Sequence, residues 1–181
     1  MERCNECGFV YDDFAVSAVA GGLRSSAERF RSLLLAGTGA DWETRLRQRP
    51  DPKVWSPLEY ACHVRDVFLV QRDRLYHILV EDCPTLSPMH REERVGLARY
   101  NEDEPATVAA EIEFAGGLLA RSFERLDETQ WQWTCVYSYP APTTRTVAWV
   151  GRQTMHEAIH HALDISRLLN VGPSSGSPSF D

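Results

Sequence analysis

The sequence of 181 residues lacks the features of a membrane protein or a nucleic-acid-binding protein. No apolar run reaches the roughly 18 to 20 residues that a membrane-spanning helix needs, and the N-terminus begins with polar residues and cysteine rather than with a signal peptide. The net charge of −7 is opposite in sign to the charge that a phosphate backbone attracts. We therefore expect a cytoplasmic protein that binds neither membranes nor nucleic acid.

Lysine is almost missing. Lys53 is the only lysine among the 19 basic residues, and all the others are arginine. Because arginine codons are GC-rich and lysine codons are AT-rich, this usage indicates a high-GC genome such as that of an actinobacterium.

The five cysteines do not form a disulfide framework or a complete zinc ribbon. Cys4, Cys7 and Gly8 form a CxxCG turn, the shape of one zinc knuckle, but a second CxxC pair is missing. An odd number of cysteines without an export signal fits reduced thiols or metal ligands. Cys4 and Cys7 could hold a structural metal with ligands from elsewhere, Cys62 being one candidate. The alternative is an arm of reduced thiols or a redox pair.

Helical periodicity is the main pattern that the sequence contains. Apolar residues recur at spacings of three and four in residues 17–35, 57–81, 105–127 and 146–169, which predicts four long helices. The second helix has the strongest start signal, with Ser56 as N-cap, Pro57 at the first helical position and Glu59 completing a capping box. At 43% hydrophobic residues, the chain can form one core. We expect an all-α, four-helix bundle occupying one domain over residues 1–170.

Long connections separate these helices. Residues 42–55 contain two prolines and predict a connection without a helix, and residues 82–103 predict a long loop with a short helical turn. The aromatic stretch 131–139 predicts an extended ribbon against the bundle, as either a cover for helix ends or a substrate wall. Residues 171–181 have the composition of a disordered tail.

Histidines on two of the predicted helices suggest a metal site. His156 and His160 are four residues apart, so they project from one face of a helix and can bind one ion. His63, on the second helix, could supply a third ligand, although a lone histidine there would more often be a hydrogen-bonded core residue. The string from His156 to His160 also matches HExxH of zinc proteases, but the usual third ligand downstream is missing. Bundles build metal sites from facing helices, so we expect these three histidines to bind one divalent metal.

Three motifs together resemble actinobacterial members of the DinB superfamily. They are the N-terminal CxECGF, the string WSPLEY that leads into Cys62-His63-Val64-Arg65-Asp66, and HxxxH in the last helix. The resemblance covers nearly the whole chain and implies an up-down-down-up bundle with His63, His156 and His160 as ligands. It also implies a metal-dependent enzyme, an S-transferase or isomerase that uses a low-molecular-weight thiol, which in actinobacteria is mycothiol.

The same resemblance leaves several assignments open. The metal is expected to be zinc, with nickel or iron as alternatives because imidazole suits several ions. Glu157 could accept the thiol proton or could be an ion-paired surface residue. Arg152 and Arg167 could bind substrate carboxylates or could be surface arginines. The protein could be a monomer or a homodimer.

Two other functions remain open at this point. The metal could activate water, which would make the protein a small metallohydrolase. Alternatively, the metal could be a purely structural staple between helices in a non-catalytic stress-response or binding protein. A fourth protein ligand such as His161 or Asp164 would favour the staple, whereas an open coordination position would favour an enzyme.

Overall fold

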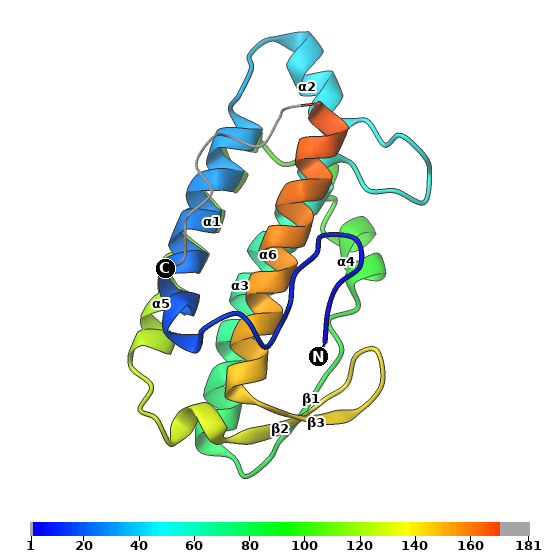
Figure 1. Cartoon of the computed structure of the whole chain (residues 1–181). Coiled ribbons are helices and arrows are strands. Elements are labelled where there is room, and N and C mark those ends of the chain that lie inside the picture. Colours follow the sequence, from blue (N-terminus) through cyan, green and yellow to red (C-terminus); the bar gives the residue numbers. More distant parts are fainter. Residues whose placement is uncertain (1, 171–181) are drawn as a thin grey trace.

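Four long helices form the body of the protein in a computed structural model that describes residues 2–170. They are α1 (Val19–Leu34), α3 (Pro57–Val80), α5 (Pro105–Glu124) and α6 (Val147–Leu169). In Figure 1, α1 and α6 run upward and α3 and α5 run downward. Helices α1 and α3 each pack against both α5 and α6. The predicted up-down-down-up bundle is therefore confirmed, and all four helices lie within a few residues of their predicted bounds.

Local capping explains why the two helices that carry the histidines start where they do. Ser56 accepts a hydrogen bond from the Glu59 amide at 3.2 Å, and the Glu59 carboxylate accepts one from the Ser56 amide at 2.8 Å, which completes the predicted capping box of α3. Thr146 caps α6 by accepting from the amide of Trp149 at 3.2 Å. These caps fix the positions of His63 and the last-helix histidines along their helices.

The connections contain more regular structure than the sequence predicts. Helix α2 (Ala40–Arg47) forms where a connection without a helix is predicted, so that prediction is wrong for residues 42–47. The helix depends on a tertiary contact, because Trp42 is buried and its indole N–H donates to the carbonyl of Leu34 at 2.9 Å. Helix α4 (Arg91–Leu97) is the predicted helical turn in the long loop. Three short 3-10 helices complete the set, Val16–Ala18, Tyr100–Glu102 and Gln130–Gln132.

A small sheet closes the lower end of the bundle in Figure 1. Strand β2 (Thr134–Tyr137) pairs in parallel with β1 (Thr85–Leu86) and antiparallel with β3 (Thr143–Thr146). Strand β2 is part of the predicted aromatic ribbon and points alternate side chains inward, with Cys135 and Tyr137 buried.

A network around Asp66 holds the long loop 82–103 against α3. The Asp66 carboxylate accepts hydrogen bonds from the Tyr100 hydroxyl at 2.6 Å and from the Arg94 guanidinium at 3.2 Å. Desolvation would raise the pKa of Asp66, but these donors and Arg65 outweigh it and lower the pKa. The loop is thereby fixed beside the site described below.

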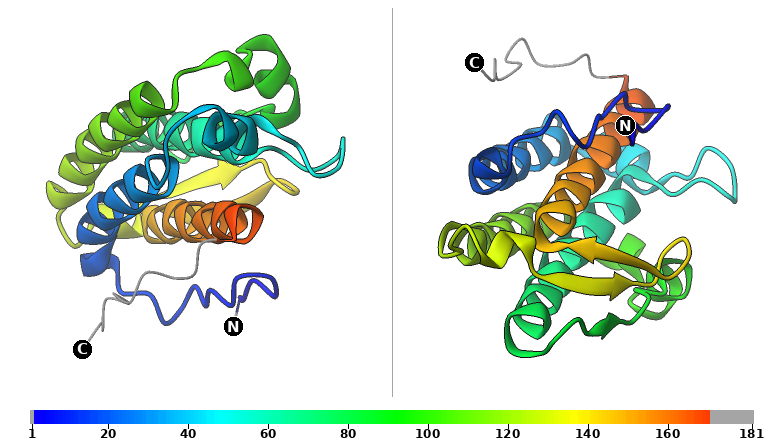
Figure 2. Two further views of the ribbon diagram at one scale, coloured as in Figure 1. Left: turned by 90° about the horizontal axis from the view of Figure 1, so that it is seen from above. Right: turned by 60° about the horizontal axis from the view of Figure 1, so that its bottom comes forward.

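The N-terminal arm, residues 2–15, lies along α6. Figure 2 shows α6 between this arm and α3. Phe9 and Tyr11 anchor the arm in the core, and both are less than 9% exposed. Helix α6 therefore presents one side to α3 and another to the arm.

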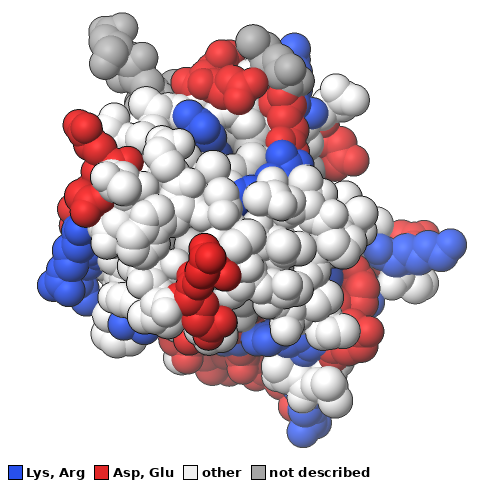
Figure 3. All heavy atoms as spheres, turned by 90° about the horizontal axis from the view of Figure 1, so that it is seen from below, with Lys and Arg blue, Asp and Glu red and all other residues white. Residues whose placement is uncertain are grey.

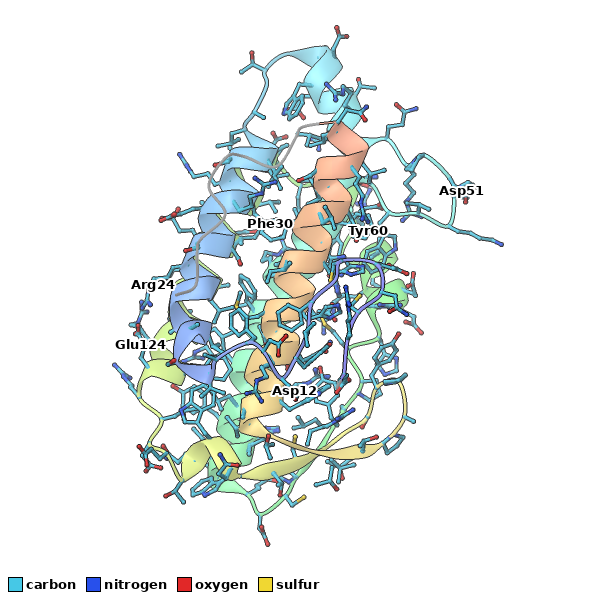
Figure 4. The ribbon with its side chains drawn as sticks, in the orientation of Figure 1. Asp12, Arg24, Phe30, Asp51, Tyr60 and Glu124 are labelled. Carbon is cyan, nitrogen blue, oxygen red and sulfur yellow. The ribbon has the colours of Figure 1, made fainter. Side chains whose placement is uncertain are left out.

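Three of the labelled side chains lie in the core or form an ion pair on the surface. Phe30 points into the core, and Arg24 pairs with Glu124 at 2.7 Å to join α1 to α5 (Figure 4). The face at the sheet end is mostly uncharged, with a group of acidic side chains near its middle and side chains of both signs at its rim (Figure 3). Within residues 2–170, no helix is long and apolar enough to cross a bilayer. The predicted tail lies outside the described residues.

Candidate metal centre

Helix α6 carries two overlapping pairs of side chains of the types that bind metals. His156 and His160 form one pair four residues apart, and Glu157 and His161 form a second pair shifted by one residue. A shift of one residue turns the side chain by about 100° around the helix, so the two pairs face different neighbours. The second pair faces α3 and the first faces the N-terminal arm.

The inner cluster consists of His63, Glu157 and His161. Its donor atoms all lie within 4.8 Å of one another. One oxygen of Glu157, Oε2, lies 3.5 Å from Nε2 of His63 and 3.4 Å from Nε2 of His161. Tyr60 of α3 lies beside α6 (Figure 4) and stacks on His161 at 5.1 Å between ring centroids.

The arm cluster consists of Cys4, Cys7, His156 and His160. These four donor atoms also lie within 4.8 Å of one another, and Sγ of Cys4 is 3.6 Å from Nδ1 of His160. Both cysteines are free thiols and half-buried. The arm therefore places two sulfur atoms beside the histidine pair.

The electrostatics of the inner cluster favour an ionised carboxylate. Desolvation would raise the pKa of Glu157, but the His161 and His63 imidazoles outweigh it and hold the pKa well below its usual value. Burial lowers the pKa of His161, but Asp164 and Glu157 more than offset it and raise the pKa to about 9. Burial lowers the pKa of His63.

In the arm cluster, burial lowers the pKa of His156 and raises that of the Cys7 thiol to about 11. Burial therefore keeps both groups neutral when no ion is bound.

Two of the clustered histidines have polar atoms with no hydrogen-bond partner. Both ring nitrogens of His63 and both ring nitrogens of His156 are buried and unpaired within the described part of the chain. An unpaired buried polar atom lowers the free energy of unfolding by about 1–3 kcal/mol. A bound ion would provide the missing partner. One such histidine lies in each cluster, so both donor sets fit a metal.

Two cavities meet at Glu157. One, of about 310 Å³, is bordered by Val67, Met89, Tyr137 and Arg74 and reaches His63 and Glu157. The other, of about 670 Å³, is more polar and reaches Glu157 and His161 past Asn5, Lys53 and Arg145. Glu157, Gln153, Tyr139, Arg91 and Glu92 line both cavities.

The structure divides the predicted three-histidine set between two clusters. His63 lies with Glu157 and His161, whereas His156 and His160 lie with the cysteines. Sequence reasoning considered His161 only as a fourth ligand. The sequence does contain a signal for His161 as a ligand. His161 lies four residues after Glu157, the same spacing that separates His156 from His160.

The predicted third cysteine is not part of the arm cluster. Cys62 is fully buried on α3, and its thiol faces the Tyr100 carbonyl and Asp103, each at 3.7 Å. Helical rotation turns it away from the arm, and burial raises its pKa.

The predicted substrate arginines hold the arm instead. Arg152 donates to the carbonyl of Phe14 at 2.9 Å, and Arg167 donates to the carbonyl of Glu6 at 3.1 Å. The arginines that border the 310 Å³ cavity are Arg74 and Arg91. Arg152 and Arg167 line neither of the two cavities, and their role in substrate binding stays a prediction.

A helical bundle with histidine-rich clusters on facing helices defines a class of metal-binding protein. The chain belongs to the DinB superfamily, whose sequence profile matches residues 28–165. Among curated proteins, none matches the chain at a significant level.

Two solved structures share the fold. YfiT from Bacillus subtilis, described as a probable metal-dependent hydrolase with an unusual four-helix bundle topology, superposes with a TM-score of 0.72 at 14% identity, over 87% of this chain and 89% of that chain. The mycothiol-dependent maleylpyruvate isomerase superposes with a TM-score of 0.67 at 14% identity, over 87% of this chain and 63% of that chain. At this identity the likeness concerns the fold, and the chain spans less than two thirds of the isomerase.

Proposed function

We propose that the protein is a metal-dependent enzyme that activates a low-molecular-weight thiol, with mycothiol as the first candidate, for transfer to or isomerisation of an electrophilic small molecule. The proposed ligands of the catalytic metal are His63, Glu157 and His161. Zinc is the first candidate for the metal, and nickel and iron are alternatives. This set replaces His156 and His160 of the sequence-based prediction.

The distances within the inner cluster support this ligand set. In a tetrahedral zinc site, nitrogen and oxygen ligands with bonds of about 2.0–2.2 Å lie about 3.4 Å from each other. The two distances from Glu157 to the histidines, 3.5 and 3.4 Å, match that value. His63 Nε2 has no hydrogen-bond partner within residues 2–170, so its contact with Glu157 is better explained by a shared ion. As a ligand, Glu157 would no longer serve as the proton acceptor that the sequence suggested.

Outer side chains orient these ligands. Asp164 lies 3.0 Å from Nδ1 of His161, which leaves Nε2 of that ring directed at the cluster. Gln153 donates to the second oxygen of Glu157 at 2.6 Å and accepts from the Tyr11 hydroxyl. Such partners fix the tautomer and the orientation of metal ligands.

Three protein ligands leave one position for a thiol. A divalent metal held there would supply a Lewis acid that favours the thiolate over the thiol. The protein contributes the neutral imidazole of His63, the carboxylate of Glu157 and a partly apolar cavity beside them.

The single observation that carries the thiol assignment is the meeting of two cavities at Glu157. A reaction between a thiol and an electrophile needs two organic substrates close together, whereas hydrolysis needs one substrate and water. The polar cavity suits a sugar-bearing thiol such as mycothiol, and the more apolar cavity suits the electrophile.

Arg74 gives the apolar cavity a preference for anionic electrophiles. It is 9% exposed, and its guanidinium binds the Tyr137 hydroxyl at 2.9 Å, Gln71 and the carbonyl of Ser87. All three partners are uncharged, so the positive charge is available to a substrate carboxylate. We expect Arg74→Met to raise KM for carboxylated electrophiles about 10- to 100-fold, as loss of a charged hydrogen bond predicts, and to leave uncharged electrophiles less affected.

The test is thiol binding and thiol consumption by the metal-loaded protein. Calorimetry in two buffers of different ionisation enthalpy should show that mycothiol binding releases a proton, because the bound thiol becomes a thiolate. Mycothiol should then be required for turnover of an electrophile, with maleylpyruvate as the first probe. His63→Ala should lose both effects, whereas His77→Ala, an exposed histidine on the same helix, should keep them.

Two results would contradict the proposed thiol chemistry. Mycothiol binding of equal strength in the metal-free and His63→Ala proteins would refute the proposal. Ester hydrolysis that needs the metal and is inhibited by mycothiol would favour the metallohydrolase.

A further inference from the structure

The arm cluster takes no part in the proposed reaction, yet it is the more complete of the two donor sets. Its members come from two places far apart in sequence, the CxxCG turn of the arm and the middle of α6. We propose that Cys4, Cys7, His156 and His160 form a closed structural zinc site that fastens the N-terminal arm to α6.

The distances fit a tetrahedral ion. With a zinc–sulfur bond of about 2.3 Å and a zinc–nitrogen bond of about 2.0–2.1 Å, a sulfur ligand and a nitrogen ligand lie about 3.6 Å apart. Sγ of Cys4 and Nδ1 of His160 are separated by 3.6 Å. All four donor atoms fall within 4.8 Å of one another, which is the compactness that one ion requires.

The burial of His156 is an independent reason for an ion at this place. Both of its ring nitrogens are buried, and neither has a hydrogen-bond partner in the described chain. Phe9 and Tyr11 enclose the ring at 5.7 and 5.5 Å between centroids, so an apolar environment surrounds it. A zinc ion gives one of these nitrogens a partner, and otherwise the imidazole would be buried at a cost.

Backbone hydrogen bonds fix the CxxCG turn of the arm. Gly8 adopts φ of 79°, a left-handed conformation that suits glycine. The Gly8 amide donates to the Cys4 carbonyl at 2.9 Å, and the Cys4 amide donates to the Phe9 carbonyl at 2.9 Å. This turn places both sulfurs on the side of α6.

The ligand count separates the two sites chemically. Two thiolates and two imidazoles complete a tetrahedron without an open position, which is typical of structural rather than catalytic zinc. The inner cluster has three ligands and borders both cavities, whereas the arm cluster, through Cys4, His156 and His160, borders only the polar one. The expected metal content is therefore two zinc ions per chain, one in each site.

Cobalt substitution tests the arm site without any assay of activity. Cobalt bound by two thiolates in a tetrahedron gives a thiolate-to-cobalt charge-transfer band and intense visible bands. We expect these bands in the parent protein and in His63→Ala, and we expect them to disappear in the Cys4→Ser/Cys7→Ser protein and to lose their tetrahedral intensity in His156→Ala/His160→Ala. Cys83→Ser is the matched control, since Cys83 lies outside both clusters and should change nothing.

A second measurement uses only the parent protein, so it does not depend on whether the variants fold. In the zinc-loaded parent protein, alkylation followed by mass spectrometry should find Cys4 and Cys7 protected, and a chelator should expose both while the rate at Cys83 stays the same. Unchanged thiolate bands in His156→Ala/His160→Ala, or equal alkylation with and without zinc, would overturn the proposal. Loss of the bands in His63→Ala would show a single shared site. A failure of thiol binding leaves all these outcomes unaffected, so the two proposals can fail separately.

Discussion

The inner cluster and the arm cluster use the same helix in different ways. Each takes two side chains that are four residues apart on α6, and the two pairs are offset by a single residue. The inner cluster adds His63 from the packed helix α3, whereas the arm cluster adds two cysteines from a segment with almost no regular structure. The same helix therefore presents one candidate donor set to α3 and the other to the N-terminal arm.

The inner cluster is completed by a bundle helix and the arm cluster by the N-terminal arm. This difference predicts that the two ions would have different roles. Both ligand-bearing helices of the inner cluster belong to the bundle, so the cluster should persist without its ion. The arm has little regular secondary structure and is held to α6 by buried Phe9 and Tyr11 and by Arg152 and Arg167, so its ion should add to the stability that these contacts give. Removing ligands should therefore impair mainly function at one cluster and mainly stability at the other.

The largest effect is expected from His161→Ala. Loss of one of three ligands should release the catalytic ion and lower the turnover rate about 1,000-fold or more, equivalent to about 4 kcal/mol. The thermal unfolding midpoint should fall as well, because the bound ion and the buried imidazole both stabilise the folded chain, so turnover is compared well below the transition. Steady-state kinetics and metal analysis check this, with the exposed His77→Ala as control. Normal turnover in a protein that has lost one metal ion would assign catalysis to the other cluster.

Substitution of both arm cysteines should have the next largest effect, and the effect should be on stability. A structural ion present at 100 to 1,000 times its Kd contributes about 3–4 kcal/mol, which corresponds to a fall of roughly 6–16 °C in Tm for a chain of this size. Turnover below the transition should fall only a few-fold. Calorimetric melting of Cys4→Ser/Cys7→Ser beside Cys83→Ser measures it. A double variant that melts normally but is inactive would reverse the roles of the two clusters.

Asp164 is where the two clusters meet. Its Oδ2 lies 3.0 Å from Nδ1 of His161 and 3.4 Å from Nε2 of His160, one histidine from each cluster. Asp164→Asn removes the charge that orients both rings, and loss of such a partner weakens metal binding about 10- to 100-fold. We expect weaker binding at both sites, measured by competition with a chelator. Weakening at only one site would show which histidine depends on this carboxylate.

Local signals in the sequence predict much of the fold. The Ser56, Pro57 and Glu59 start signal acts through hydrogen bonds within one turn, so it can be read without knowledge of the tertiary structure. Helix α2 has no such cap, and its formation depends on the burial of Trp42 against residues before the helix. Sequence patterns do not reveal that contact.

In the candidate site, too, local spacing is predictable from the sequence and tertiary contacts are not. Spacing places His156 with His160 and also Glu157 with His161, but only the rotation of α6 against α3 decides which pair meets His63. The CxxCG turn predicts a metal-binding arm, and the path of the arm along α6 selects its partners. Cys62 was a reasonable candidate by residue type, and its helix turns it the other way.

The smallest effect is expected from Tyr11→Phe, which tests whether the arm also acts on the inner cluster. The Tyr11 hydroxyl donates to the carbonyl oxygen of the Gln153 side chain, and this fixes the amide so that its N–H₂ donates to Glu157 at 2.6 Å. Without the hydroxyl the amide can rotate and present its oxygen to the carboxylate. Loss of one hydrogen bond of about 1 kcal/mol should lower turnover about 5-fold.

Two further measurements decide how the Tyr11 effect arises. The cobalt–thiolate bands of Tyr11→Phe should match those of the parent protein, because the arm zinc does not use this residue. Gln153→Leu should lower turnover at least as much, and adding Tyr11→Phe to it should cost nothing more, since both act through the same hydrogen bond to Glu157. Fully additive losses would mean that the Tyr11 hydroxyl acts on the inner cluster by a route that does not pass through Gln153.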